Sequence, residues 1–204
     1  MSDLYLTIPA PAQAVFTEKR SKFIAFAYPV STVTEAMERV GELAKKYYDA
    51  RHVCWAYMLG HERTEFRAND NGEPSGTAGK PILGQINSLG LTNVLVAVVR
   101  YFGGIKLGTP GLIVAYRTAA RMALEEAGAV ERHLTAAYSF SYPYAVIDEA
   151  MKVSRMPGVK VLDAVYDNLC RLDLEVELDA LPAVRHAVGD IEGACENDNQ
   201  NQSL

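Results

Sequence analysis

Residues 70–81 read Asp70-Asn71-Gly72-Glu73-Pro74-Ser75-Gly76-Thr77-Ala78-Gly79-Lys80-Pro81, a turn-rich loop whose last proline suits the first position of a helix over residues 82–89. A nearly all-apolar strand follows at residues 92–101, as expected for a strand that is covered on both faces. It leads into a second loop, Gly103-Gly104-Ile105-Lys106-Leu107-Gly108-Thr109-Pro110-Gly111, and then into a long helix over residues 112–127. Two glycine-rich loops, each leading into a helix, therefore flank one buried strand.

The segments before the first loop predict more strands and one helix. Residues 14–30 alternate around the charged stretch at 18–22 and predict two strands or one bent strand. Residues 32–48 have apolar side chains at helical spacing, with Ser31 or Thr32 as the cap and Glu35 as its acidic partner. Strands are predicted at residues 52–59 and 66–70. The first domain is thus expected over residues 1–133 with an α+β fold.

The pattern starts again after Arg132. A strand at 134–142, a helix at 144–155, two strands at 159–166 and 169–178, and a helix at 181–191 predict a small ferredoxin-like α+β domain over residues 134–195, without a convincing last strand. Residues 196–204 are polar and predict a flexible tail.

Composition limits the class of protein. Hydrophobic residues make up 49% and charged residues 22%, which is typical of a soluble globular protein. No apolar run is long enough to cross a bilayer, and no signal peptide is recognisable. The three cysteines, Cys54, Cys170 and Cys195, are far apart and form no CxxC pair. We therefore expect a cytoplasmic protein with no membrane contact, no cofactor and no metal site.

Charge is divided unevenly between the two domains. Residues 1–133 hold 15 Lys/Arg and 13 Asp/Glu, whereas residues 134–204 hold 5 and 12. The net charges of +2 and −7 predict weak attraction of phosphates to the first domain and repulsion from the second. In residues 172–179, acidic side chains alternate with apolar ones, so one strand face is acidic. The acidic C-terminal domain is therefore not expected to bind nucleic acid, although it could bind a basic protein.

The two loops predict an anion-binding surface. Helix N-termini present free N–H groups, and glycines allow close approach of a ligand. The residues assigned to this surface are Arg51, Lys80, Arg100, Lys106, Gly76, Gly79, Gly103, Gly104 and Gly108. Alternatively, the glycines only shape the loops and the cations are solvated. Neither loop matches a nucleotide-binding fingerprint, which disfavours an ordinary NTPase or dehydrogenase.

Three ionisable residues are candidates for catalysis. Asp70 and Glu73 could form an acid/base pair, and His52 could carry a proton. The alternative is turn chemistry at Asp70, with Glu73 paired to a nearby arginine. Cys54 is expected to be a small core residue. On the helix predicted at residues 112–127, a polar stripe is formed by Arg117, Arg121 and Glu125. We expect this stripe to face solvent.

Four segments together resemble the signature of the YigZ/IMPACT family: residues 70–81, residues 99–108, Arg51-His52 with Cys54, and residues 18–24. The resemblance implies a first domain like the second domain of ribosomal small-subunit protein five and a ferredoxin-like second domain. It also implies a role near translation, since eukaryotic relatives regulate translation initiation, whereas bacterial members have no settled biochemical activity. This sequence departs from the family at Asn71, Pro110 and Val114, and the last of these shortens the basic stripe before Arg117.

The sequence therefore predicts a translation-associated regulatory or binding protein whose loop surface binds RNA phosphates, a ribosomal partner or another anion. The alternative is an enzyme acting on a small anionic substrate, with Asp70, Glu73 or His52 as acid/base groups. A third hypothesis is a scaffold that binds a basic partner through the acidic strand of the second domain.

Overall fold

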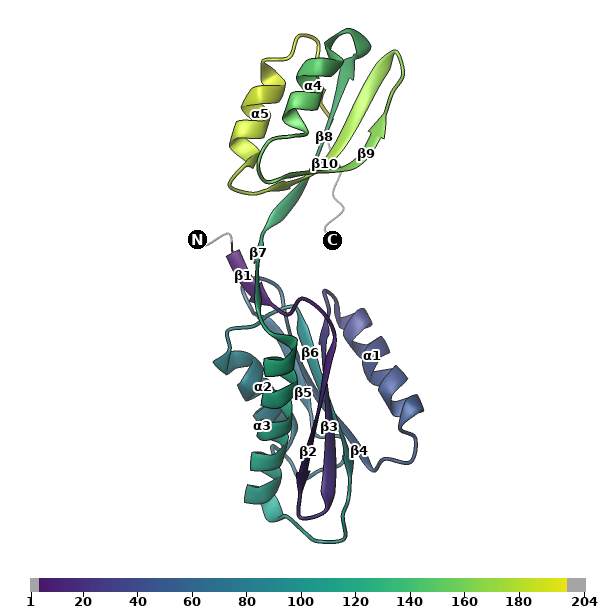
Figure 1. Ribbon diagram of the computed structural model, residues 1–204, viewed down its shortest axis with the longest axis vertical. Helices are drawn as coiled ribbons and strands as arrows, with labels where there is room; N and C mark the ends of the chain where they lie inside the picture. The colour runs from purple at the N-terminus through teal and green to yellow at the C-terminus, as the bar shows by residue number, and fades with distance from the viewer. Residues whose placement is uncertain (1–3, 198–204) are drawn as a thin grey trace. The chain divides into compact units, whose positions relative to one another are not determined.

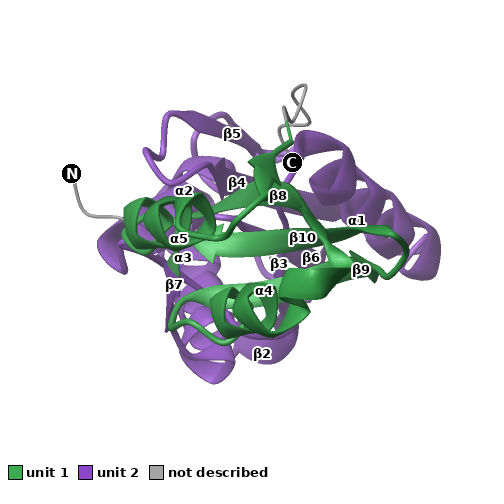
Figure 2. Cartoon of the chain, turned by 90° about the horizontal axis from the view of Figure 1, so that it is seen from above, with its two compact units in different colours: residues 1–3, 133–204 green, residues 4–132 purple. Residues whose placement is uncertain are grey.

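The structure, a computed structural model, describes residues 4–197 and divides them into two compact units (Figures 1 and 2). In order along the chain, the first unit is Leu4–Arg132 (purple, unit 2 in the key of Figure 2), and the second begins at His133 (green, unit 1 in that key). This division falls one residue before the predicted boundary. Within the described residues, no helix is long and apolar enough to cross a membrane.

The first unit is built on a five-stranded antiparallel sheet with the order β2-β3-β6-β4-β5. These strands are β2 (Ala12–Glu18), β3 (Ser21–Pro29), β6 (Val94–Tyr101), β4 (His52–Leu59) and β5 (Glu65–Asn69). A separate two-stranded sheet pairs β1 (Leu4–Thr7) with β7 (Val130–His133).

Helices cover both faces of this five-stranded sheet (Figure 1). α1 (Val33–Lys46) packs on one face, against the side chains around Trp55 and Leu95. α2 (Gly79–Ser88) and α3 (Gly108–Ala127) pack on the other face, against those around Phe23 and Val98. The apolar run in β6 is buried on both sides, as its sequence predicts. The predicted cap of α1 is also present, because Thr32 accepts from the Glu35 N–H and Glu35 accepts from the Ser31 N–H.

The two helices that follow the glycine-rich loops begin earlier than predicted, and β1 and β7 are strands that the sequence analysis does not predict. The helix α2 begins at Gly79, so Pro81 is its third residue. The helix α3 begins at Gly108, so residues 108–111 belong to its first turn and the second loop is shorter than expected. Pro110 is compatible with this position because the first turn of a helix needs no N–H from it.

The second unit has the predicted ferredoxin-like arrangement. Its sheet has the order β11-β8-β10-β9, and its helices pack on one face. The elements are β8 (Thr135–Pro143), η1 (Tyr144–Val146), α4 (Ile147–Val153), β9 (Val159–Val165), β10 (Leu169–Glu177), α5 (Leu181–Gly189) and β11 (Cys195–Glu196). β11 is the last strand of the ferredoxin-like pattern, which the sequence analysis did not find. It pairs with β8. Glu196 and Asn197 therefore do not belong to a flexible tail, and the rest of that predicted tail, residues 198–204, lies outside the described residues.

The acidic face of β10 carries its own counter-charges. Leu172, Leu174 and Val176 are buried beneath the helices, so the alternating acidic side chains occupy the opposite, helix-free face of the sheet. Arg171 pairs there with Asp163 and Asp173, and Lys160 pairs with Glu175. These ion pairs reduce the acidic character that the sequence alone predicts.

Candidate functional site

Several residues chosen from the sequence meet where β6 ends and where β3 and β4 begin, beside the two glycine-rich loops. The strand register places Phe23 of β3 opposite Arg100 of β6, and Arg100 opposite His52 of β4. Phe23 belongs to the core beneath α2 and α3, so Arg100 and His52 face the same side of the sheet. Glu73 reaches this row from the first loop and Tyr116 reaches it from α3.

Glu73 is the centre of a buried polar network. Its Oε1 atom accepts hydrogen bonds from Arg100 Nη1 at 2.5 Å and from the Tyr116 hydroxyl at 2.8 Å. Both members of the ion pair are buried, with side-chain exposures of 8% for Arg100 and 4% for Glu73. The Arg100 guanidinium also lies 5.5 Å from the ring centre of Phe23 and 5.8 Å from that of Phe102. The pairing of Glu73 with an arginine, one of the two alternatives left by the sequence, is therefore present.

Asp70 caps the N-terminus of α2. Its carboxylate accepts hydrogen bonds from the N–H groups of Gly76, Ala78 and Gly79, at 2.8, 3.0 and 2.8 Å. Partial burial alone would raise the pKa of Asp70. These hydrogen bonds and the charge of Lys80 outweigh burial and hold the pKa below its ordinary value. The N–H groups that we had assigned to an external anion at Gly76 and Gly79 are thus occupied by a carboxylate of the chain itself.

His52 and Cys54 also make contacts with the first loop. His52 Nδ1 donates to the Asn71 carbonyl at 2.8 Å, and its Nε2 atom lies 3.9 Å from Glu73 Oε1. The Cys54 sulfur is fully buried, 2.9 Å from the Asp70 carbonyl and 3.3 Å from the Tyr116 hydroxyl. Burial raises the pKa of Cys54 to about 12, so a reactive thiolate is not formed at neutral pH. Cys54 is a core residue, as the sequence predicts.

Glycines are required where each loop lies against backbone. A side-chain carbon on Gly103 would lie 2.0 Å from the Arg20 carbonyl carbon, and one on Gly79 would lie 2.7 Å from the Asn69 nitrogen. Gly103 therefore brings the second loop against the turn between β2 and β3. The other glycines assigned to the surface, Gly76, Gly104 and Gly108, have positive φ angles.

The remaining assigned cations are exposed. Arg51, Lys80 and Lys106 form no ion pair with any residue between 4 and 197. Arg100 differs from them because it is buried against Glu73 and is not available to a large partner.

Sequence reasoning missed three further cations at residues 19–22, in the turn between β2 and β3 and at the start of β3. Lys19, Arg20 and Lys22 are exposed, and both Lys19 and Arg20 have positive φ, which is uncommon for residues with side chains. Their contact with the second loop through Gly103 brings this basic turn to the same end of the unit. The run of charge was visible in the sequence, but its contact with a loop about eighty positions away was not.

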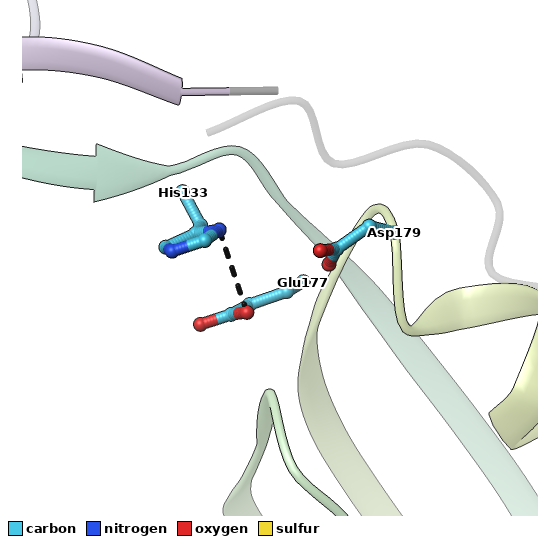
Figure 3. Close-up of side chains that lie close together, drawn as sticks. All are labelled: His133, Glu177 and Asp179. Carbon is cyan, nitrogen blue, oxygen red and sulfur yellow. Dashed lines mark ion pairs between the residues drawn. The ribbon is translucent and has the colours of Figure 1, made fainter. Parts of the chain in front are cut away.

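A separate group of possible metal ligands lies in the second unit (Figure 3). His133, Glu177 and Asp179 each offer one ligand atom, and these atoms lie within 4.8 Å of one another. His133 Nδ1 and Glu177 Oε2 are 3.5 Å apart, so two of the three groups already contact each other directly. We assign no metal to this partly exposed group.

Comparison with known proteins places these residues in a family. Residues 19–124 match the model of the Impact N-terminal domain. The chain is 41% identical to the IMPACT family member YvyE of Bacillus subtilis over 130 residues, which cover 64% of this chain and 60% of that protein. It is 31% identical to the IMPACT family member YigZ of Escherichia coli over 185 residues, which cover 90% of this chain and 88% of that protein.

A solved structure supports the fold over nearly the whole chain. The crystal structure of a hypothetical protein has a TM-score of 0.74 and 26% identity, and the match covers 99% of this chain and all of that one. The matched family model spans the β2–β3 turn, both glycine-rich loops and the network around Glu73. The chain therefore belongs to the IMPACT family.

Proposed function

We propose that this protein is a translation-associated binding protein whose first unit contacts the phosphates of RNA, in the ribosome or in a complex associated with it. The proposed surface consists of Arg51, Lys80 and Lys106, together with the basic turn at residues 19–22. The role in translation is the one implied by the family resemblance of the two loops. The ligand class is proposed from charge and exposure.

One observation carries this proposal: the acidic side chains of the first loop are held by contacts within the protein, whereas the exposed basic side chains around the loops form no ion pair among the described residues. Asp70 accepts three backbone N–H bonds, and Glu73 is paired with Arg100. Arg51, Lys80 and Lys106 are exposed and form no ion pair among the described residues, although Lys80 lies near enough to Asp70 to lower the pKa of that carboxyl. Exposed, unpaired cations at one end of a domain are what a phosphate backbone requires.

The same contacts weigh against the alternative of an acid/base enzyme. A general base needs a free lone pair within reach of a substrate, at a pKa near the working pH. The pKa of Asp70 is lowered and its oxygens are occupied, while Glu73 is nearly inaccessible. His52 is partly exposed, but its Nδ1 atom donates a hydrogen bond to the Asn71 carbonyl.

The test is binding of the full chain to purified ribosomes and to single-stranded RNA, by co-sedimentation and fluorescence anisotropy. We expect affinity to fall as salt rises from about 50 to 200 mM, and to fall at least about tenfold at low salt in the triple variant Arg51→Ala, Lys80→Ala, Lys106→Ala. The matched control is Arg39→Ala, Lys45→Ala, Lys46→Ala, which removes the same charge from α1 on the opposite face of the sheet. Absence of binding by the unmodified chain at low salt, or equal losses in both triple variants, would overturn the proposal.

A further inference from the structure

An open groove runs between α2 and α3 on the surface of the first unit. Its lining residues are Gly76, Lys80, Pro81, Gly84, Gln85, Ile113 and Arg117. Its volume of about 540 Å³ lies within the range of sites that hold small ligands or a single nucleotide. Of these residues, Gly76 and Lys80 are the two that the sequence assigns to a binding surface.

The charge of the groove is entirely basic. Lys80 and Arg117 are its only charged lining residues, one from each helix, and neither forms an ion pair within residues 4–197. Arg121, one turn further along α3, is different, because its guanidinium donates to Glu125 at 2.6 Å. Asp70 interacts electrostatically with Lys80, but its carboxylate is already held by three N–H groups. An anion in the groove would therefore meet two cations that lack other strong partners.

The shape of the groove keeps those cations accessible. Gly84 lies in the interior of α2, and a side-chain carbon built there would meet no atom within 4 Å. Its φ is not positive, so neither backbone conformation nor close packing requires glycine at this position. Glycine in a helix interior costs about 1 kcal/mol relative to alanine, and here it leaves this part of the groove lining without a side chain. The Lys80 side chain lies along Gly76, 3.6 Å from a carbon built on that glycine.

We infer that this groove binds the phosphate group of a nucleotide, with Lys80 and Arg117 as the charged ligands and the Gln85 amide as a further donor. The choice of RNA as the ligand that supplies this phosphate rests on the proposed function. A free nucleotide carries the same phosphate group, so the experiment below distinguishes the two ligands. Arg117 forms paired hydrogen bonds with two phosphate oxygens, whereas Lys80 acts as a point charge. Arg117 is thus assigned to binding, although the sequence favoured a solvated role for it.

The first experiment locates the ligand in the groove. The full chain, labelled with nitrogen-15, is titrated separately with inorganic phosphate, adenosine monophosphate and a short single-stranded oligouridylate. We expect amide shifts at Gly76, Lys80, Gly84 and Arg117. Shifts with the oligonucleotide alone identify RNA as the source, and shifts with the monophosphate identify a free nucleotide. The absence of groove shifts with all three probes would overturn the inference.

Two variants and their controls test the residues. Arg117→Ala should weaken binding of the effective probe roughly fivefold to tenfold by removing one charge-assisted contact. Gly84→Leu should abolish the amide shifts at the groove residues, because the leucine side chain fills the space beside position 84 without changing the charge. Arg121→Ala and Gly41→Leu are matched controls on α3 and α1, and a carbon built on Gly41 also meets no atom within 4 Å. Dispersed amide spectra of all four variants confirm that they are folded.

The outcomes separate this inference from the proposed function. If ribosome and RNA binding persist unchanged in Arg117→Ala and Gly84→Leu, the groove does not bind RNA phosphate, and the proposed surface of Arg51, Lys80, Lys106 and residues 19–22 is left as the RNA-binding site. If the unmodified chain ignores RNA and ribosomes but binds the monophosphate in the groove, the proposed function fails and the groove stands.

Discussion

At the scale of single residues, Asp70 has the same role that an external anion would have at a helix N-terminus. Its carboxylate accepts three N–H groups at the start of α2, where helix geometry leaves the backbone donors unpaired. Asn71 and Gly72 have positive φ and turn the chain back, so that Glu73 N–H donates to the Asp70 carbonyl. The turn positions Glu73 for its pair with Arg100. The backbone N–H groups of this glycine-rich loop, which the sequence predicts to bind an external anion, therefore bind the carboxylate of Asp70 instead.

Replacement of Asp70 by asparagine should lower the free energy of unfolding by about 1–2 kcal/mol at neutral pH, because the amide provides one acceptor where the carboxylate provides two. The pKa of Asp70 is lower in the folded state than its ordinary 3.8, so the stabilisation is complete well above that value and is lost as pH falls through the lower, folded pKa. Urea unfolding at neutral pH and near pH 3 measures both effects.

The control for this prediction is Glu126→Gln, which neutralises an exposed carboxylate on α3 that has no ion pair among the described residues. It should change stability by less than about 0.5 kcal/mol. If the deficit of Asp70→Asn is as large at pH 3 as at neutral pH, charge on the cap is not its cause.

At the scale of elements, sequence patterns located most helices and strands but not the contacts between loops. The capping pair of Thr32 and Glu35 is local, and it predicted the start of α1 correctly. β11 was missed because a two-residue strand has no periodicity, and the start of α3 was missed because glycine and proline in a first turn resemble a loop. In the site, Glu73 meets Arg100 and Tyr116 from 27 and 43 positions away. Such distances along the chain leave no local signal.

The contact between the second loop and the β2–β3 turn predicts a strong effect at Gly103. Gly103→Ala should destabilise the first unit by roughly 1–3 kcal/mol, because the added carbon would overlap the backbone of Arg20 and Ser21. Gly41→Ala is the matched control within α1 and should stabilise by about 0.5–1 kcal/mol, since space is free there. Thermal unfolding followed by Trp55 fluorescence compares the two variants. Equal stability of Gly103→Ala and the unmodified chain would show that the loop does not require this close approach.

At the scale of the whole molecule, the two units have separate hydrophobic cores. The first has one core on each face of its sheet, and the second has a single core between its sheet and its two helices. No residue is shared between the cores of the first unit and that of the second. Since cooperative unfolding depends on shared buried contacts, we expect two transitions rather than one.

The single tryptophan makes this expectation measurable, because Trp55 is buried in the first unit and its fluorescence reports on that unit alone. Leu172→Ala removes a fully buried side chain from the second core and should destabilise that unit by about 2–5 kcal/mol. In urea, the circular dichroism of the variant should show an earlier transition, while the fluorescence transition stays where it is in the unmodified chain. Leu95→Ala, which is equally buried beside Trp55, should move the fluorescence transition instead. If Leu172→Ala moves both signals together, the units unfold as one, and the separation of their cores does not govern stability.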